Sequence, residues 1–141
     1  MSTRREADTG PCAVLVDAEG SIVLEAENTV VTEGHCLGHD ETNLIRAASA
    51  RFDAEFLSGC TLYASTEPCA MCACAIYWSN IRRVVFALSE AELREIVGGS
   101  ESPALALPCR EIFARGEHEV VVSGPQLDVQ ASAVHVGYWG G

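Results

Sequence analysis

The sequence predicts a three-layer α/β domain in which helices cover a β-sheet. The predicted elements follow one another in the order β-β-α-β-α-β-α-α-β-α, and a helix that starts with a proline directly follows the central strand. The chain has 141 residues, the size of one domain, and it shows no repeat, linker or low-complexity tract. We therefore expect a single domain over residues 1–141.

The first half of the chain predicts a hairpin, a helix and a strand. Strands at 13–16 and 22–27 flank a turn at 17–20. Residues 29–38 are expected to form a loop. A helix from about His39 follows, because apolar residues recur there at helical spacing: Leu44, Ile45, Ala48 and Phe52. A short strand is predicted within 59–66.

The second half alternates helices and strands. Pro68 fits the start of a helix that runs from Cys69 to about Ser79. A strand at 82–88 comes next, followed by a helix at 89–97, which Gly98 and Gly99 close. A short helix near Pro108, a strand at 119–123 and a helix at 126–136 complete the prediction.

The composition argues against a nucleic-acid partner. The chain carries 20 acidic residues and nine basic ones, a formal net charge of −11. All nine basic residues are arginine, and such a balance repels phosphate backbones. A small neutral substrate is expected instead. Without an apolar run of about 20 residues or a secretory signal, the sequence predicts a soluble, cytoplasmic protein with no membrane contact.

The seven cysteines do not predict a disulfide framework, because their number is odd and the expected compartment is reducing. Cys12, Cys60 and Cys109 are adjacent to apolar residues and are expected in the core. Cys74 is two residues beyond Cys72, about 200° around the helix, and is expected to pack rather than to bind a metal.

Two motifs predict a metal centre: GHDE at 38–41 and EPCAMC at 67–72. Cys69 and Cys72 are three residues apart in the first turn of a helix, where the helix dipole favours thiolates. His39 would complete a set of three ligands, as in catalytic zinc sites, which leave the fourth position to water. Glu41 follows His39 by two residues and could carry protons without binding the metal.

Either motif alone is weak, but together they match H-x-E…P-C-x-x-C, the signature of zinc deaminases. A structural zinc site without enzymatic activity is the alternative. In that case Cys36, Cys74 or His35 would provide a fourth ligand, and Glu41 would have no role.

Residues 11–122 resemble the cytidine deaminase-like superfamily, which includes cytosine, guanine and tRNA adenosine deaminases. The resemblance implies an α/β/α fold with a mixed five-stranded sheet. It also implies Zn²⁺ bound by His39, Cys69 and Cys72, with Glu41 as the proton shuttle. Asn28, eleven residues before His39, would form a hydrogen bond with the substrate base.

The segment CAIYWSNIRRVVFA is most similar to guanine deaminases. This similarity implies deamination of a free guanine-type base or a related amino-heterocycle, with Trp78 in the base pocket or else in the core. Cytosine or a nucleoside is the alternative substrate, and tRNA adenosine is less favoured. Because bacterial members usually form dimers, a homodimer is expected, and the C-terminal tail could cap a pocket.

Three features depart from the family pattern. Asp40 stands where the family usually has a small apolar residue, and its carboxyl group could raise the pKa of Glu41 or face solvent. Guanine deaminases use a further acidic residue, for which Glu101 is a candidate by position alone; a solvated loop charge is the preferred interpretation of Glu101. Only about ten residues precede Pro11, where the family usually has a helix.

Overall fold

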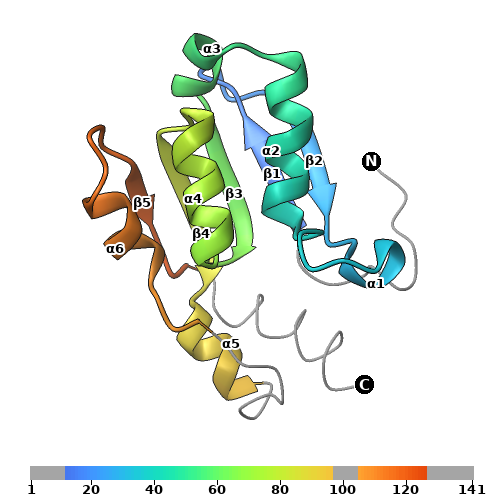
Figure 1. The fold of residues 1–141 in the computed structure, drawn as a ribbon. Helices are drawn as coiled ribbons and strands as arrows, with labels where there is room; N and C mark the ends of the chain where they lie inside the picture. Colours follow the sequence, from blue (N-terminus) through green and yellow to red (C-terminus); the bar gives the residue numbers. More distant parts are fainter. Residues whose placement is uncertain (1–11, 97–104, 127–141) are drawn as a thin grey trace.

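The computed structural model describes residues 12–96 and 105–126, which form a mixed five-stranded sheet with helices packed on it (Figure 1). The strand order is β2-β1-β3-β4-β5, and β1 runs antiparallel to both of its neighbours. β3, β4 and β5 are parallel to one another. The strands are β1 Cys12–Val16, β2 Ile22–Glu27, β3 Thr61–Thr66, β4 Arg83–Leu88 and β5 Val121–Ser123. The predicted α/β fold with a mixed five-stranded sheet is confirmed.

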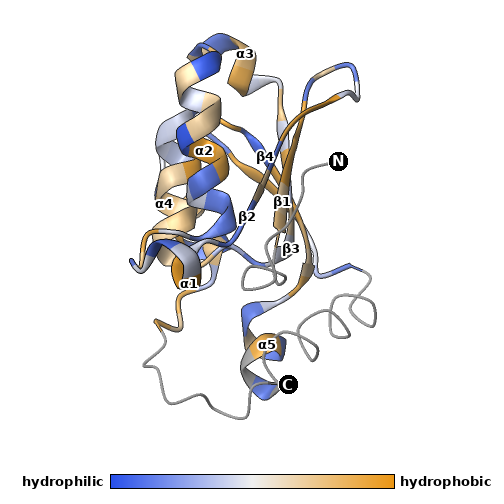
Figure 2. Cartoon of the chain, turned by 90° about the vertical axis from the view of Figure 1, so that its right-hand side faces the viewer, coloured by the Kyte–Doolittle hydropathy of each residue, from blue (hydrophilic) through white to orange (hydrophobic). Residues whose placement is uncertain are grey.

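Six helices are described: α1 Val30–Glu33, α2 Asp40–Arg51, α3 Ala54–Ser58, α4 Ala70–Ser79, α5 Glu90–Ile96 and α6 Cys109–Ala114. α2 and α4 lie next to each other on one face of the sheet (Figures 1 and 2). Four of the six helices, and all five strands, were predicted to within about two residues. The helix predicted at 126–136 falls almost entirely outside the described residues.

α1 and α3 were not predicted from the sequence. α3 starts after Asp53, whose carboxylate accepts a hydrogen bond from the backbone N–H of Phe56 at 2.8 Å. The apolar pattern of α2 runs on through Phe52 into α3, which hides the break between the two helices. α1 lies within the segment expected to be a loop, and it is a single turn that ends at Gly34 in the left-handed conformation.

Alternation along the strands places the core between the sheet and the pair α2 and α4. On β3, Leu62 and Ala64 are buried, whereas Tyr63 between them is 45% exposed. In the register of the sheet, Leu62 is paired with Val84 and Ala64 with Phe86. The helices contribute fully buried side chains to the same core: Leu44 and Ala48 from α2, and Ala73 and Ile76 from α4.

All seven cysteines are free thiols, but only some are in the core as expected. Cys60 and Cys109 are fully buried, which confirms the prediction for them. Cys12 and Cys74 are exposed, so the packing roles expected for these two residues were wrong. Cys12 alternates with buried Ala13 on β1 and therefore points to the other face of the sheet.

The helices α2 and α4 both begin at the end of the sheet where β3 ends (Figure 1). The loops that follow β2, β3 and β4 meet at this end, and the candidate site lies there. Within the described ranges, no helix is long and apolar enough to cross a membrane.

Candidate metal centre and its cavity

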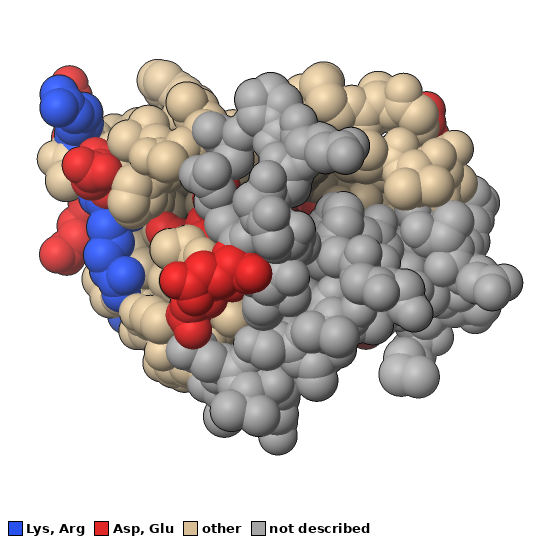
Figure 3. All heavy atoms as spheres, turned by 90° about the horizontal axis from the view of Figure 1, so that it is seen from below, with Lys and Arg blue, Asp and Glu red and all other residues tan. Residues whose placement is uncertain are grey.

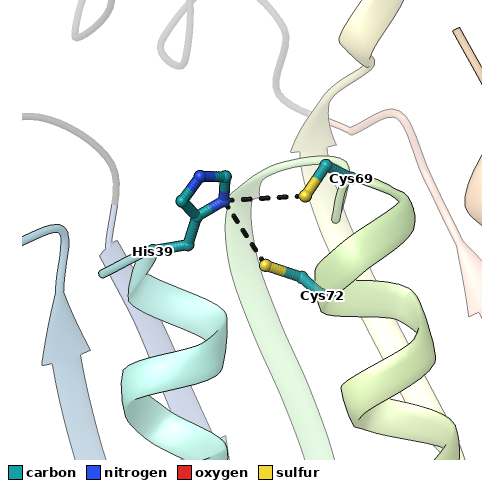
Figure 4. Close-up of side chains that lie close together, drawn as sticks. All are labelled: His39, Cys69 and Cys72. Carbon is teal, nitrogen blue, oxygen red and sulfur yellow. Dashed lines mark hydrogen bonds between the residues drawn. The ribbon is translucent and has the colours of Figure 1, made fainter. Parts of the chain in front are cut away.

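His39 and Cys69 occupy equivalent positions, each directly before the first turn of a helix. His39 precedes α2 and Cys69 precedes α4, and both have extended backbone angles. Cys72 lies in the first turn of α4. The three side chains converge, with Nδ1 of His39 3.6 Å from Sγ of Cys69 and 3.5 Å from Sγ of Cys72 (Figure 4).

These distances fit a tetrahedral zinc site. Bond lengths of about 2.3 Å to sulfur and about 2.05 Å to nitrogen place the nitrogen and a sulfur about 3.6 Å apart at the tetrahedral angle. The three ligand atoms lie within 4.8 Å of one another. Three protein donors leave the fourth position to water, which is the arrangement of catalytic rather than structural sites.

A proton on Cys72 forms a hydrogen bond with Cys69. The pKa of Cys69 is lowered to about 4, first by this hydrogen bond and also by one with His39, although burial opposes the shift. The hydrogen bond with Cys69 raises the pKa of Cys72, which burial also raises. A divalent cation would displace this proton and hold both sulfurs as thiolates.

Two carboxyl groups lie buried next to this trio, since Asp40 is 3% exposed and Glu41 is 5% exposed. Burial raises the pKa of Glu41 well above its usual range, and the charge of Asp40 raises it further. Burial also raises the pKa of Asp40. The expectation that Asp40 raises the pKa of Glu41 is confirmed, and the alternative that it faces solvent is wrong, because it lines a cavity.

That cavity has a volume of about 330 Å³ and opens beside His39 and Cys69. The carboxyl groups of Asp40 and Glu41 provide part of its polar lining, together with Asn28. Its apolar wall comes from α1 and α5 and consists of Val30, Val31 and Leu93. A small, partly apolar cavity with a few converging polar groups is typical of a small-molecule site.

Asn28 lies in the cavity with a defined orientation. Its Oδ1 accepts a hydrogen bond from the backbone N–H of Val30 at 2.9 Å. The oxygen end of the amide is thereby fixed on the chain, which leaves the Nδ2 group available to donate to a ligand. The structure thus places the predicted substrate-binding residue beside the candidate metal ligands.

A network of hydrogen bonds fixes the loop between β2 and α2. The Nδ2 group of Asn43 donates to the carbonyl of Glu27 at 2.9 Å and to the hydroxyl of Thr29 at 2.8 Å. The backbone N–H of Thr29 donates to the carbonyl of Gly38 at 2.7 Å. A Cβ at position 38 would lie 2.8 Å from the Thr29 hydroxyl, so this close approach requires glycine. The loop therefore holds both Asn28 and His39 in place.

Glu67 braces two helices, a role that its sequence context does not predict. Its two carboxylate oxygens accept hydrogen bonds from the backbone N–H groups of Glu90 at 3.1 Å and Cys109 at 3.0 Å, the first residues of α5 and α6. Its own N–H donates to the carbonyl of Leu88 at 2.7 Å. One side chain thus joins the segment that leads to Cys69 to two further helices, including the one that walls the cavity.

Trp78 does not line this cavity. It is 82% exposed, so it is not in the core either. Its position on α4 explains why: it is nine residues beyond Cys69, about 14 Å along the helix and on its opposite side. Neither of the two roles considered for Trp78 within its own chain is observed.

The fourth ligands of the structural-zinc alternative also lie elsewhere. Cys36 and Cys74 are exposed, and Nε2 of His35 lies 3.5 Å from the carboxylate of Glu33. Among the described residues, the only cluster of three or more potential ligand atoms is the trio shown in Figure 4. Glu101 and the C-terminal tail lie outside the described ranges, so their expected roles remain predictions.

Comparison with known proteins identifies the family. Residues 3–88 match the cytidine and deoxycytidylate deaminase zinc-binding region. The chain belongs to this family. A family member of this kind is a zinc-dependent deaminase, a hydrolase, and the trio of His39, Cys69 and Cys72 is positioned to bind its zinc ion.

Individual members differ in substrate. The chain is 38% identical over 130 residues to a probable cytosine deaminase of Schizosaccharomyces pombe, covering 91% of this chain and 78% of the relative. It is 36% identical over 86 residues to the guanine deaminase of Bacillus subtilis, covering 61% of this chain and 55% of the relative. A solved guanine deaminase from Nitrosomonas europaea superimposes with a TM-score of 0.73 at 26% identity, covering 93% and 73% of the two chains.

Replacing Cys72 by serine should remove zinc from the protein. The hydroxyl group of serine is a poor zinc ligand, and two remaining donors bind the ion weakly. Cys74→Ser is the matched control, because Cys74 is exposed on the same helix. We expect the metal content, measured by mass spectrometry, to be one zinc per chain in the wild type and in Cys74→Ser and close to none in Cys72→Ser. Loss of zinc from both variants would contradict the three-ligand site.

Replacing Glu67 by alanine should loosen α5 and α6 without removing zinc. The variant loses both acceptors for the N–H groups of Glu90 and Cys109, which we expect to lower the free energy of unfolding by about 1–3 kcal/mol. Urea denaturation of the zinc-loaded protein measures this change. Glu95 is exposed on α5, and Glu95→Ala should change the free energy of unfolding by less than about 0.5 kcal/mol. Equal stability of both variants would show that Glu67 does not brace the two helices.

Proposed function

We propose that this protein removes the exocyclic amine of a free nucleobase or related amino-heterocycle by hydrolysis and releases ammonia. The observation that carries the proposal is the three-ligand centre with the buried Glu41 beside it, facing a cavity of about 330 Å³. A structural zinc site would need neither a carboxyl group there nor a cavity.

The residues of the site have three separate roles in the proposed reaction: metal binding, proton transfer and orientation of the substrate. His39, Cys69 and Cys72 would hold Zn²⁺, which as a Lewis acid activates water for attack on the carbon that bears the amine. The Glu41 carboxyl group would accept the first proton of that water and pass it to a ring nitrogen. It would then carry the second proton, from the hydroxyl group added to the ring carbon, to the amine, which leaves as ammonia. Asn28 donates from Nδ2 to an acceptor atom of the ring and so fixes its orientation.

A guanine-type base is the preferred substrate. The similarity of the segment after Cys72 to guanine deaminases supports this choice, as does the structural similarity to the Nitrosomonas protein. The surface charge supports a small molecule over RNA. Figure 3, seen from the end where α5 lies, shows acidic atoms near the centre of the described surface and arginine atoms along one edge. Glu90 and Glu92, in the first turn of α5, are at this end.

Cytosine is the second candidate substrate. The relative from Schizosaccharomyces pombe, which is called a probable cytosine deaminase, is 38% identical over 91% of this chain. Because base specificity depends on pocket shape and on hydrogen bonds from loops, the shared metal centre accommodates either ring.

Replacing Glu41 by glutamine should abolish ammonia release and leave the zinc content unchanged. The amide cannot carry a proton, and we expect the turnover rate to fall by about 10²–10⁴-fold. Glu33→Gln is the matched control, because Glu33 is acidic, exposed at the end of α1 and not among the residues that line the cavity. Ammonia release and metal content are measured for the wild type, Glu41→Gln and Glu33→Gln. Ammonia release from Glu41→Gln at the rate of the wild type would contradict the proposed role of Glu41.

The same assay identifies the substrate when it includes guanine, cytosine, adenine, their nucleosides, aminotriazines and a tRNA anticodon stem-loop. We expect the highest kcat/KM for guanine or a related free base. Ammonia release from the RNA alone would overturn the preference for a small substrate. A zinc-loaded wild type that releases no ammonia from any of these compounds would favour a structural zinc site.

We also propose that the protein is a cytoplasmic homodimer with Trp78 in the dimer interface. The free state of all seven cysteines is compatible with a reducing compartment. A tryptophan that is 82% exposed is unusual on a monomer surface and typical of interface centres.

Replacing Trp78 by glutamate should therefore shift the protein from dimer to monomer, because a buried interface disfavours an unpaired charge. Light scattering coupled to size-exclusion chromatography measures the mass. Phe56→Glu, at another partly exposed aromatic residue, should leave the dimer intact. A wild type of monomer mass would refute the homodimer, and a dimeric Trp78→Glu would place the interface elsewhere.

A further inference from the structure

The cavity beside the candidate metal centre is lined by several carboxyl groups. The described residues that line it include the acidic residues Asp40, Glu41, Glu67 and Glu90. Among these described lining residues only His39 can carry a positive charge, and it is a candidate metal ligand. Two thiolates would cancel the charge of a bound Zn²⁺, so the metal would not offset the acidic residues. A negatively charged group of a ligand would therefore find no basic side chain in this part of the cavity.

The helices that begin around the cavity carry negative groups of their own. Free N–H groups and the positive dipole end make the start of a helix a common binding site for phosphate. The first turn of α2, however, contains Asp40 and Glu41. The carboxylate of Glu67 accepts the N–H groups of Glu90 and Cys109 at the starts of α5 and α6. These carboxyl groups occupy the positions in which a phosphate group would be stabilised.

Glu90 lies where a large substituent of a bound ring would leave the cavity. It is the first residue of α5 and is half-buried, whereas the two acidic residues of α2 are buried next to the metal centre. Glu90 also lines a smaller adjoining cavity of about 170 Å³. A ring whose amine faces the metal would direct a sugar phosphate away from the buried end and toward Glu90.

The charge of Glu90 acts across the cavity. The pKa of His39 is raised mainly by its hydrogen bond with Cys69, although burial lowers it, and the charge of Glu90 adds to the increase. A ligand between α5 and the metal centre lies in the same field. A cleft lined by charges of one sign concentrates that field, so it attracts cations and repels anions.

We propose that Glu90 is a specificity-determining residue that excludes substrates with a phosphate group. The inference rests on the proposed deaminase function and deepens it, because the family is named for cytidine and for deoxycytidylate, a nucleoside and a nucleotide. It restricts the substrate class to amino-heterocycles without phosphate, either free bases or nucleosides. A phosphate group beside Glu90 would bring like charges together where water screens them poorly.

Pairs of a nucleoside and its 5′-monophosphate test this role, because the two members differ only in the phosphate group. The pairs are based on guanosine, cytidine and deoxycytidine, and the free bases guanine and cytosine are the reference ligands. Calorimetry on the zinc-loaded Glu41→Gln protein measures binding without turnover. Glu90→Gln and Glu90→Lys are added to this background, and both keep the backbone N–H group that Glu67 binds.

We expect the nucleoside to bind at least about tenfold more tightly than its monophosphate when Glu90 is present. Glu90→Gln should reduce this preference at least about threefold and Glu90→Lys at least about tenfold, with little change in affinity for the nucleoside. A rise in salt from about 0.05 M to about 0.5 M should also weaken the preference, because salt screens charges. Glu95→Gln, which removes an exposed acidic residue from the same helix, should retain it.

Three results would overturn the inference. Equal affinity for nucleoside and monophosphate in the presence of Glu90 would show that phosphate is not excluded. A preference that survives both substitutions and high salt would show that shape, not the charge of Glu90, excludes the phosphate group. Binding of the free bases alone, or of no ligand, in every variant would show that Glu90 does not select among these ligands.

The proposed deamination is judged separately, by ammonia release from the wild type. If the preference for nucleosides responds to Glu90 but the wild type releases no ammonia from any amino-heterocycle, the deaminase function fails while the exclusion of phosphate stands. If ammonia is released but the preference does not respond to Glu90, the deaminase function stands and the role of Glu90 fails.

Discussion

The packing of α2 against α4 sets the distance between the His39 ring and the two thiols. Both helices begin at the same end of the sheet, and His39 and Cys69 directly precede their first residues. Ala48 on α2 and Ala73 on α4 are both fully buried and belong to the same core cluster as the strands. A relative shift of about 1 Å would move the donors out of zinc-bonding range. The geometry of the metal centre therefore depends on the core beneath it.

The packing of α2 against α4 also brings several acidic groups together in a buried site. Two thiols and the carboxyl groups of Asp40 and Glu41 lie together at the first turns of the two helices. The positive ends of both helix dipoles favour negative charge there, and a divalent cation compensates more of it. Without the cation, the hydrogen bond between the two thiols lowers the pKa of Cys69 and raises that of Cys72, which keeps the proton on Cys72. Binding of the metal must therefore release protons, which couples affinity for the ion to the folding of this end of the domain.

The residues of the metal centre could be predicted from sequence because each stands at the start of a helix, and a helix start has local signals. The strands were found because period-two alternation follows directly from burial on one face. Long-range contacts have no such signal. Glu67 bonds residues 23 and 42 positions away, and nothing in its own neighbourhood indicates them. Trp78 was misplaced because α4 is apolar on all sides, so periodicity does not show which face is exposed.

Residues at helix starts form the candidate metal centre, whereas residues with long-range contacts position the cavity walls. We expect the first group to carry the chemistry and the second to set the selectivity. The candidate metal ligands and Glu41 are anchored by secondary structure, whereas the relatives of this chain are named for two different bases, cytosine and guanine. The cavity walls come instead from the loop after β2 and from α5, which Glu67 holds in place across the chain. Loops and short helices tolerate substitution better than a packed core, so substrate choice can change there without disturbing the metal. Asp40 belongs to both groups, because it is the first residue of α2 and also lines the cavity.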